Sequence, residues 1–311
     1  MNALVTGGAG FIGRWVVKAL LDKKINVFAL DNLSNGRKEN LDEFKENENF
    51  KGLIVGDIKN KKILSEIFKN KIDVCLHLAA SINIHDSIVD PEATVQNNVF
   101  GTLNVLEEAR KSKTKVVFMS SAHVYSEAKG RAIDEEHPTK ASSPYSASKI
   151  AGENLASSYW NAYGLPVAIV RPFTAYGPYQ KGNSEGGVTS IFTQRCIEGK
   201  KLEVYGNGSQ TRDLFYVEDC ADFIVRAALS EKANGEIFNA GSGKDISMKE
   251  LALFICKDSG KLAFAKHPHP QSEVGKMVCD YSKAKRILGW EPTTSLEKGL
   301  ELTKEWLKQS K

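Results

Sequence analysis

The chain has 311 residues, which is enough for a sizeable hydrophobic core and for two domains. Its 42 Lys and Arg residues nearly balance 38 Asp and Glu residues, and a net charge of +4 spread along the chain argues against nucleic-acid binding. No apolar run approaches the roughly 18 residues of a membrane span, and the five cysteines form no C-x-x-C pair. We therefore expect a cytoplasmic protein with no membrane partner, no metal site and no disulfide framework.

Residues 1–172 alternate between short apolar runs and longer helical segments. The runs are rich in Val, Ile and Leu, and they predict strands in the sequences ALV, INVFAL, FKGLIVGD, IDVCLHLAA, KVVFMSS and LPVAIVRP. Strands that alternate with helices are typical of a parallel sheet covered on both faces. The pattern predicts an α/β fold, a Rossmann-type doubly wound parallel sheet.

Two helical segments have readable starts. An apolar stripe predicts a helix over 10–21, directly after the first strand. Asp90 and Pro91 predict the N-cap and first turn of a helix over 90–110. The face that this second helix buries is expected to carry the apolar residues Val95, Val99, Leu103 and Leu106.

The pattern changes after residue 172. Glycine and polar residues dominate 177–187, and a helix, short strands and a final amphipathic helix follow. We predict that 1–172 form the nucleotide-binding domain and that 173–311 form a smaller C-terminal α/β domain for the substrate. The two are expected to interleave, because a segment around 212–240 returns to the first domain.

A glycine-rich turn joins the first predicted strand to the first helix. Residues 6–13 read TGGAGFIG, which contains the spacing G-x-G-x-x-G. Glycines in this context let the backbone approach a pyrophosphate, and the helix N-terminus offers it free N–H groups. The turn predicts that a dinucleotide binds here, with Gly7, Gly10, Phe11, Ile12 and Gly13 as contacts.

The second predicted strand ends in Asp31. A carboxylate at this place accepts hydrogen bonds from the adenine ribose hydroxyls and repels a 2′-phosphate, so it favours NAD over NADP. Arg37 and Lys38 follow closely and favour NADP, but Asp31 is better placed. Asp57, at the end of the third strand, either reaches the adenine edge or caps the following helix.

Tyr145 and Lys149 stand four residues apart in the sequence PYSASK, so on a helix they share one face. An isolated pair of this kind is usually part of an ordinary surface helix. Beside a nicotinamide the pair gains a role, because the ammonium and the positive ring lower the phenol pKa from about 10 toward neutrality. Ser120 and Ser121 end the fifth strand at the sheet edge where folds of this class bind ligands.

The chain resembles the extended short-chain dehydrogenases/reductases, in the nucleotide-sugar epimerase/dehydratase branch that includes UDP-glucose 4-epimerase, over essentially its whole length. The resemblance rests on TGGAGFIG, DNLSNGRKENL, HLAA, NNVFGTLNVLEEAR, SSAHVY, PYSASK, RPFTAYGP, VYGNGSQTRDLFYVEDCADF and DYSKAKRILGWEP. It implies that Tyr145 is the catalytic base, Lys149 its partner and Ser121 the hydroxyl that orients the substrate. Ser121 is preferred over Ser120 because the family's Ser or Thr lies four residues before Tyr125.

The resemblance also implies which residues contact NAD and the nucleoside-diphosphate sugar. The implied cofactor residues are Gly7, Gly10, Phe11, Ile12, Gly13, Asp31, Asn32, Asp57, Ile58, Leu78, Ala79, Ala80, Asn98, Ser120, Tyr145, Lys149 and Pro172. The implied substrate residues are Ser121, Ala122, His123, Tyr145, Thr174, Val188, Arg212 and Glu273. Arg212 is expected to clamp the diphosphate, although an Arg followed by an Asp is also a common surface pair.

Three segments depart from the family pattern. Dehydratases and decarboxylases of the branch carry acidic residues after the catalytic Ser or Thr, where this chain has Ala122 and His123, and this favours an epimerase. His123 either fills space beside the substrate or acts as an acid or base. Thr174 replaces a frequent Asn, and Pro270 stands where a second diphosphate arginine is usual. Lys276, His267 or His269 are candidates to replace that arginine.

The resemblance thus implies an NAD-dependent nucleotide-sugar 4-epimerase with a transient 4-keto intermediate. UDP-glucose and UDP-galactose are the leading pair of substrates, followed by N-acetylated or uronic UDP-sugars. The alternatives are a 4,6-dehydratase or reductase of the same family, or a non-catalytic protein that senses NAD or a nucleotide sugar. The family usually forms homodimers through helices near 91–112 and 144–163, and we expect the same here.

Overall fold

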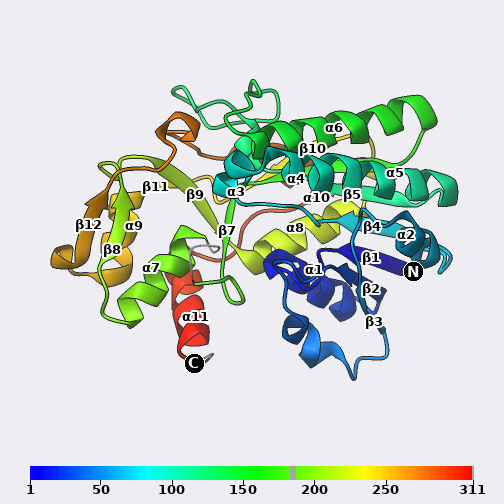
Figure 1. The fold of residues 1–311 in the computed structure, drawn as a ribbon, viewed down its shortest axis with the longest axis horizontal. Coiled ribbons are helices and arrows are strands. Elements are labelled where there is room, and N and C mark those ends of the chain that lie inside the picture. Colours follow the sequence, from blue (N-terminus) through cyan, green and yellow to red (C-terminus); the bar gives the residue numbers. More distant parts are fainter. Residues whose placement is uncertain (183–186, 310–311) are drawn as a thin grey trace.

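The computed structural model describes residues 1–182 and 187–309. Its largest sheet has seven parallel strands in the order β10-β6-β5-β4-β1-β2-β3 (Figure 1). These strands are β1 (Asn2–Thr6), β2 (Asn26–Asp31), β3 (Phe50–Val55), β4 (Val74–His77), β5 (Lys115–Met119), β6 (Val167–Pro172) and β10 (Ile237–Ala240). The six strands predicted before residue 173 are confirmed. The strand order reverses between β1 and β4, which is the switch point where open α/β sheets bind ligands.

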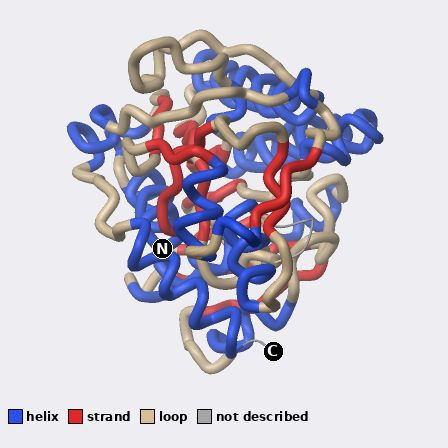
Figure 2. The backbone as a smooth tube through the Cα atoms, turned by 90° about the vertical axis from the view of Figure 1, so that its left-hand side faces the viewer, coloured by secondary structure: helices blue, strands red, loops and turns tan. Residues whose placement is uncertain are grey.

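Helices cover both faces of this sheet, and Figure 2 shows the strands lying between helical layers. On one face α1 packs against α8, and their side chains share one core cluster with β1 and β4. On the other face α2, α5 and α6 share a second cluster. These helices are α1 (Phe11–Asp22), α2 (Lys61–Phe68), α5 (Gly101–Ser112), α6 (Pro144–Tyr163) and α8 (Val217–Leu229). The predicted Rossmann-type fold class is confirmed.

The helix predicted over 90–110 has a different buried face from the one expected. It consists of α4 (Pro91–Val95), a π-helical turn (Gln96–Phe100) and α5, and Asp90 caps its start as predicted. Of the predicted apolar face Leu106 is buried, whereas Val95 is 38% exposed. The π turn adds a residue and rotates the helix, so that Thr94, Asn98 and Thr102 face inward instead. Of these buried polar side chains, Asn98 bonds the backbone of Ser81 and so holds the loop after β4, which belongs to the candidate site.

Smaller sheets gather at one end of the molecule, on the left of Figure 1. One has the order β11-β9-β7 and the other pairs β12 with β8. The strands are β7 (Thr174–Tyr176), β8 (Leu202–Tyr205), β9 (Thr211–Tyr216), β11 (Asp245–Ser247) and β12 (Leu262–Ala265), and the helices of this part are α7 (Val188–Ile197), α9 (Met248–Cys256) and α11 (Leu296–Gln309). A third core cluster, which includes Tyr176, Leu214 and Leu251, holds these elements together.

Two further short α-helices complete the α-helices of the described residues. They are α3 (Ile84–Val89), which follows β4, and α10 (Ser282–Leu288), which precedes α11. No helix in the described part of the chain is both long and apolar enough to cross a membrane.

Candidate active site

The glycine turn forms a tight cradle between β1 and α1. Gly7 has φ +72°, and its N–H donates to the Leu30 carbonyl at 2.7 Å. A Cβ added to Gly13 would lie 2.0 Å from the Gly7 carbonyl oxygen, and one added to Gly7 would lie 2.9 Å from the Ala79 nitrogen. Gly10 is the N-cap of α1 and supplies no capping side chain, so the first N–H groups of the helix are left for a ligand. The backbone here fits a pyrophosphate, and a larger side chain would fill the cradle.

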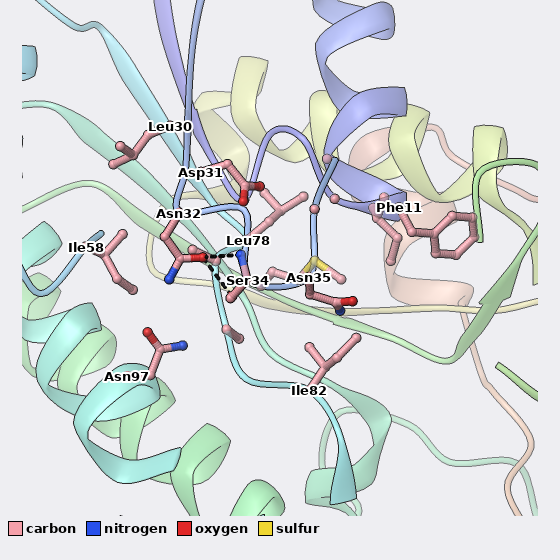
Figure 3. Close-up of a pocket in the computed structure, with 18 of the residues that line it drawn as sticks. Phe11, Leu30, Asp31, Asn32, Ser34, Asn35, Ile58, Leu78, Ile82 and Asn97 are labelled. Atoms are coloured by element: carbon pink, nitrogen blue, oxygen red, sulfur yellow. Dashed lines mark hydrogen bonds between the residues drawn. The ribbon is translucent and has the colours of Figure 1, made fainter. Parts of the chain in front are cut away.

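A cavity opens in front of this turn (Figure 3). Eleven of the predicted cofactor residues line it, namely Gly7, Gly10, Phe11, Ile12, Gly13, Asp31, Asn32, Ile58, Leu78, Ala79 and Ala80. The sequence analysis missed the other lining residues, which are Leu30, Ser34, Asn35, Gly36, Gly56, Ile82, Asn97 and Met119. Ser34, Asn35 and Gly36 begin three residues after Asp31, so their place in the chain was an available signal.

Asp31 ends β2 as predicted and is nearly buried, with 7% of its surface exposed. Its carboxylate accepts hydrogen bonds from the N–H groups of Ala9, at 3.0 Å, and Leu33, at 2.8 Å. Burial raises the pKa of Asp31, and these backbone hydrogen bonds oppose the rise. Arg37, the residue that would favour NADP, lines a neighbouring cleft instead of this cavity.

Six predicted cofactor residues do not line this cavity: Asp57, Asn98, Ser120, Tyr145, Lys149 and Pro172. Asp57 accepts from the Asn32 side chain at 3.1 Å and from the Lys59 N–H at 2.8 Å, so it organises the turn before α2. Asn98 bonds the N–H and carbonyl of Ser81 and the Ser148 hydroxyl, and it therefore holds the loop after β4 against α6.

Tyr145 and Lys149 lie one turn apart at the start of α6. Pro144 occupies the first helical position, and Ser143 and Ser146 form a capping box, which fixes where the helix begins. The Lys149 ammonium donates to the Met119 carbonyl at 2.9 Å. Because Met119 also lines the cavity, this bond joins the predicted catalytic pair to the predicted cofactor site.

Burial dominates the protonation of this pair. It lowers the pKa of Lys149 to about 8, and Glu153 opposes that shift. It raises the pKa of Tyr145, which is 6% exposed, and a hydrogen bond with the Ser121 side chain opposes the rise. The pKa of Tyr145 is thus shifted upward, opposite to the lowering that we expected from Lys149, whose ammonium is bonded to the Met119 carbonyl. Ser121, Tyr145 and Lys149 are nevertheless brought together as predicted. The neighbouring Ser120 hydroxyl is buried with no hydrogen-bond partner in the described part of the chain.

His123 lies beside this group. Its backbone N–H donates to the Ser121 hydroxyl at 3.2 Å, and its ring centre is 6.4 Å from that of Tyr145. Burial lowers the pKa of His123 to about 4, with the Arg212 charge acting in the same direction and Glu273 opposing it. The imidazole is therefore neutral near pH 7, and it stands between the catalytic group and two of the predicted substrate residues.

Arg212 and Glu273 form an ion pair. Arg212 also donates to the carbonyls of Thr211, at 2.7 Å, and Val274, at 2.9 Å, and Glu273 contacts the His267 ring at 2.7 Å. In this structure the guanidinium thus holds the 273–274 segment against β9. The sequence also allowed Arg212 to form a surface pair with the Asp that follows it. The structure instead pairs Arg212 with a residue 61 positions away.

The other predicted substrate residues come from separate elements. Ala122 is buried below the catalytic group, in the turn that follows β5. Thr174 lies in β7 and pairs with Leu214 of β9, two residues beyond Arg212. Val188 begins α7 and packs on the third core cluster. Of the candidates to replace the missing arginine, His269 contacts the ring of His85, a residue of α3, at 2.8 Å.

The fold and this site define a Rossmann-type enzyme class in which a Tyr-Lys-Ser group adjoins a dinucleotide cavity. The chain matches the family described as GDP-mannose 4,6 dehydratase over residues 4–303. It belongs to the NAD-dependent nucleotide-sugar epimerase/dehydratase family of extended short-chain dehydrogenases/reductases, as the sequence motifs predicted.

Individual relatives and solved structures are similar to this chain over nearly its whole length. The UDP-glucose 4-epimerase of Mycolicibacterium smegmatis is 35% identical over 311 residues, which is 99% of each protein. The X-ray structure of Pal from Bacillus thuringiensis is 52% identical, has a TM-score of 0.99 and covers 100% of both chains. The UDP-glucose 4-epimerase of Thermus thermophilus, solved in complex with NAD, is 31% identical, with a TM-score of 0.90 and 100% of both chains covered.

Proposed function

We propose that the protein is an NAD-dependent nucleotide-sugar 4-epimerase that acts on a UDP-sugar. UDP-glucose and UDP-galactose are the leading pair, with N-acetylated and uronic UDP-sugars next. The observation that carries the proposal is the contact of the Ser121–Tyr145–Lys149 group with the dinucleotide cavity through Met119. Relatives named as UDP-glucose 4-epimerases, one of them solved with NAD, support it.

NAD bound in the cavity supplies reversible oxidation of the carbon that carries the sugar C4 hydroxyl. Tyr145, as phenolate, takes the proton of that hydroxyl, and the Ser121 hydroxyl orients it. The phenol of Tyr145 needs help to ionise, because burial raises its pKa. Lys149 would provide that help through its positive charge, one helical turn from Tyr145, and it is also placed to hold the cofactor. Tyr145 returns the proton after the 4-keto sugar has turned in the site.

The substrate end of the site supplies binding energy. Arg212 has the planar donor geometry that suits a diphosphate, and we infer that it exchanges part of its ion pair with Glu273 for that group. The Glu273 oxygen that Arg212 releases is then available to the nucleotide ribose, while the other oxygen keeps its contact with His267. Thr174, on the strand next to β9, is the proposed contact for the sugar. Interactions with the nucleotide, far from the reacting carbon, keep the ketone from escaping.

The test is a panel of UDP-, dTDP-, GDP- and CDP-sugars followed by proton NMR. We expect UDP-glucose and UDP-galactose to interconvert with no added reductant and no net consumption of NAD. Accumulation of a 4-keto-6-deoxy sugar as the main product would reject epimerisation. No change in any sugar of the panel, from protein that retains NAD, would favour the sensing protein.

A 4,6-dehydratase is the second candidate, and two observations favour it. Loss of water across the C5–C6 bond needs an acid or base besides Tyr145, and the His123 imidazole is a candidate at the right place. The description of the matching family also names a dehydratase. Against this candidate, Ala122 supplies no acidic group.

We also propose that the protein forms a homodimer through α4, α5 and α6. Apolar side chains of this surface stay exposed, including Val95 at 38%, Phe100 at 48% and Trp160 at 37%. Burying such side chains against a second copy would remove apolar area from water. Sedimentation velocity should give twice the chain mass, and Phe100→Glu should shift it to the monomer.

A further inference from the structure

The five cysteines of the chain fall into two groups. All five are free thiols, and all lie within the residues that the structure describes. Cys75, Cys220 and Cys279 are buried, with at most 2% of their surface exposed. Cys196 and Cys256 are partly exposed. A small oxidant dissolved in water therefore has access to the second group and is kept away from the first.

The two partly exposed thiols lie against each other. Cys196 is in the last turn of α7, and Cys256 is the last residue of α9, 60 positions along the chain. The Cys196 thiol donates to the Cys256 sulfur at 3.2 Å and to the Ile255 carbonyl at 3.7 Å. A disulfide bond is about 2.0 Å long, so an approach of roughly 1 Å would bring the two sulfurs to bonding distance.

The backbone around these thiols is held on both sides. The Lys261 ammonium donates to the Gly199 carbonyl at 2.9 Å, and this bond joins the turn after α9 to the turn after α7. The strands that follow the two helices, β8 and β12, pair in parallel from Leu202 and Leu262 onward. The contact between the sulfurs is thus fixed by the packing of two helices and two strands, and it does not depend on the side chains alone.

Cysteines often serve only as small apolar side chains. Cys196 and Cys256 do pack on the third core cluster. Filling space, however, requires neither that two thiols touch nor that water reaches them. Burial raises the pKa of the Cys256 thiol to about 11, and the neighbouring Cys196 adds to the rise. Since the thiolate is the reactive form, we expect this pair to react faster in mildly alkaline solution than at neutral pH.

We propose that Cys196 and Cys256 are a modification site, at which a peroxide oxidises the two thiols to a disulfide that fastens α7 to α9. One sulfur, as thiolate, attacks a peroxide oxygen, the O–O bond breaks, and a sulfenic acid forms. The other sulfur attacks the sulfenic sulfur, so that the S–S bond forms as the S–O bond breaks. Two thiols and one hydrogen peroxide give one disulfide and two water molecules. A thiol reductant reverses the change by exchange.

The experiment oxidises the full chain, with any NAD that it retains, and locates the thiols by mass spectrometry. The protein is treated with a small excess of hydrogen peroxide at about pH 8.5, where an ordinary thiol is half ionised, then alkylated and cleaved with trypsin without reductant. We expect the peptides 196–200 and 250–257 to appear joined, two hydrogens lighter than their sum. Dithiothreitol should separate them again. Peptides that carry the three buried cysteines should show no disulfide, and they are the internal control.

Serine variants test the pair directly. Cys196→Ser and Cys256→Ser should each abolish the joined peptides, and thermal unfolding checks that both variants are folded. Three results would overturn the inference: both thiols still alkylated after peroxide, sulfinic acid at either position without the disulfide, or joined peptides only from chains that migrate as covalent dimers on a non-reducing gel. The inference goes beyond the proposed function and is independent of it, since disulfide formation is measured without any sugar nucleotide.

Discussion

The cofactor half and the substrate half of the site are built in different ways. Most lining residues of the dinucleotide cavity lie in strand ends and the short loops that follow them, within the first 120 residues. The substrate half draws on the turn after β5, on β9 and on the loop after β12, and an ion pair joins its parts. A cradle made from local turns is present before any ligand arrives, whereas Arg212 has to exchange partners. We therefore expect binding of cofactor and substrate to respond to different substitutions.

The largest effect is expected where the two halves meet. Tyr145→Phe removes the acid–base group and should lower kcat about a thousandfold or more, with little change in stability because the ring stays buried. Initial rates with UDP-galactose would measure this. Tyr163→Phe, on the same helix but 59% exposed, is the control and should keep the parent rate. A Tyr145→Phe enzyme as active as the parent would refute the assigned base.

A substitution in the cofactor half should remove NAD and lower stability together. In Gly13→Ala the new Cβ would stand 2.0 Å from the Gly7 carbonyl, so the turn must open. We expect loss of retained NAD and a decrease of about 3 kcal/mol in the free energy of unfolding. Urea unfolding and the nucleotide released on denaturation are the measurements. Gly260→Ala, whose Cβ would come no closer than 3.2 Å to a flexible carboxylate, should change neither.

In the substrate half the effect should be confined to the sugar nucleotide. Arg212→Ala removes the proposed diphosphate contact, and KM for the UDP-sugar should rise about tenfold to a hundredfold, while retained NAD is unaffected. Arg226→Ala, on the exposed side of α8, serves as the control. Loss of NAD in the Arg212 variant would mean that the two halves are coupled more tightly than we describe.

A smaller effect should appear in the pH dependence of stability. Burial lowers the pKa of Lys149 from 10.5 to about 8, so the cost of burying its charge is fully present below pH 8 and fades as the pH rises toward 10.5. The Lys149 contribution to the free energy of unfolding should therefore rise by about 2 kcal/mol between pH 8 and pH 10. Urea unfolding of wild type and of Lys149→Met at both values measures it. An equal change in both proteins would contradict this account.

The sequence alone determined the strands before residue 173, the glycine turn, Asp31 at the end of β2 and the start of α6. Each depends on a local physical cause: apolar runs, glycine conformations, a strand end, and a proline after a capping serine. For the same reason the family resemblance was readable from short motifs.

Only the tertiary structure decided the rest. Val95 was expected to be buried, but the π turn at Gln96–Phe100 leaves it exposed. This turn depends on the packing of Asn98 and Thr102, which no periodicity in the sequence predicts. The pairing of Arg212 with Glu273 joins residues 61 positions apart, and the pKa of Tyr145 rises because the folded chain excludes water around it. Contacts between distant segments and the loss of water from a site arise only when the chain has closed around them.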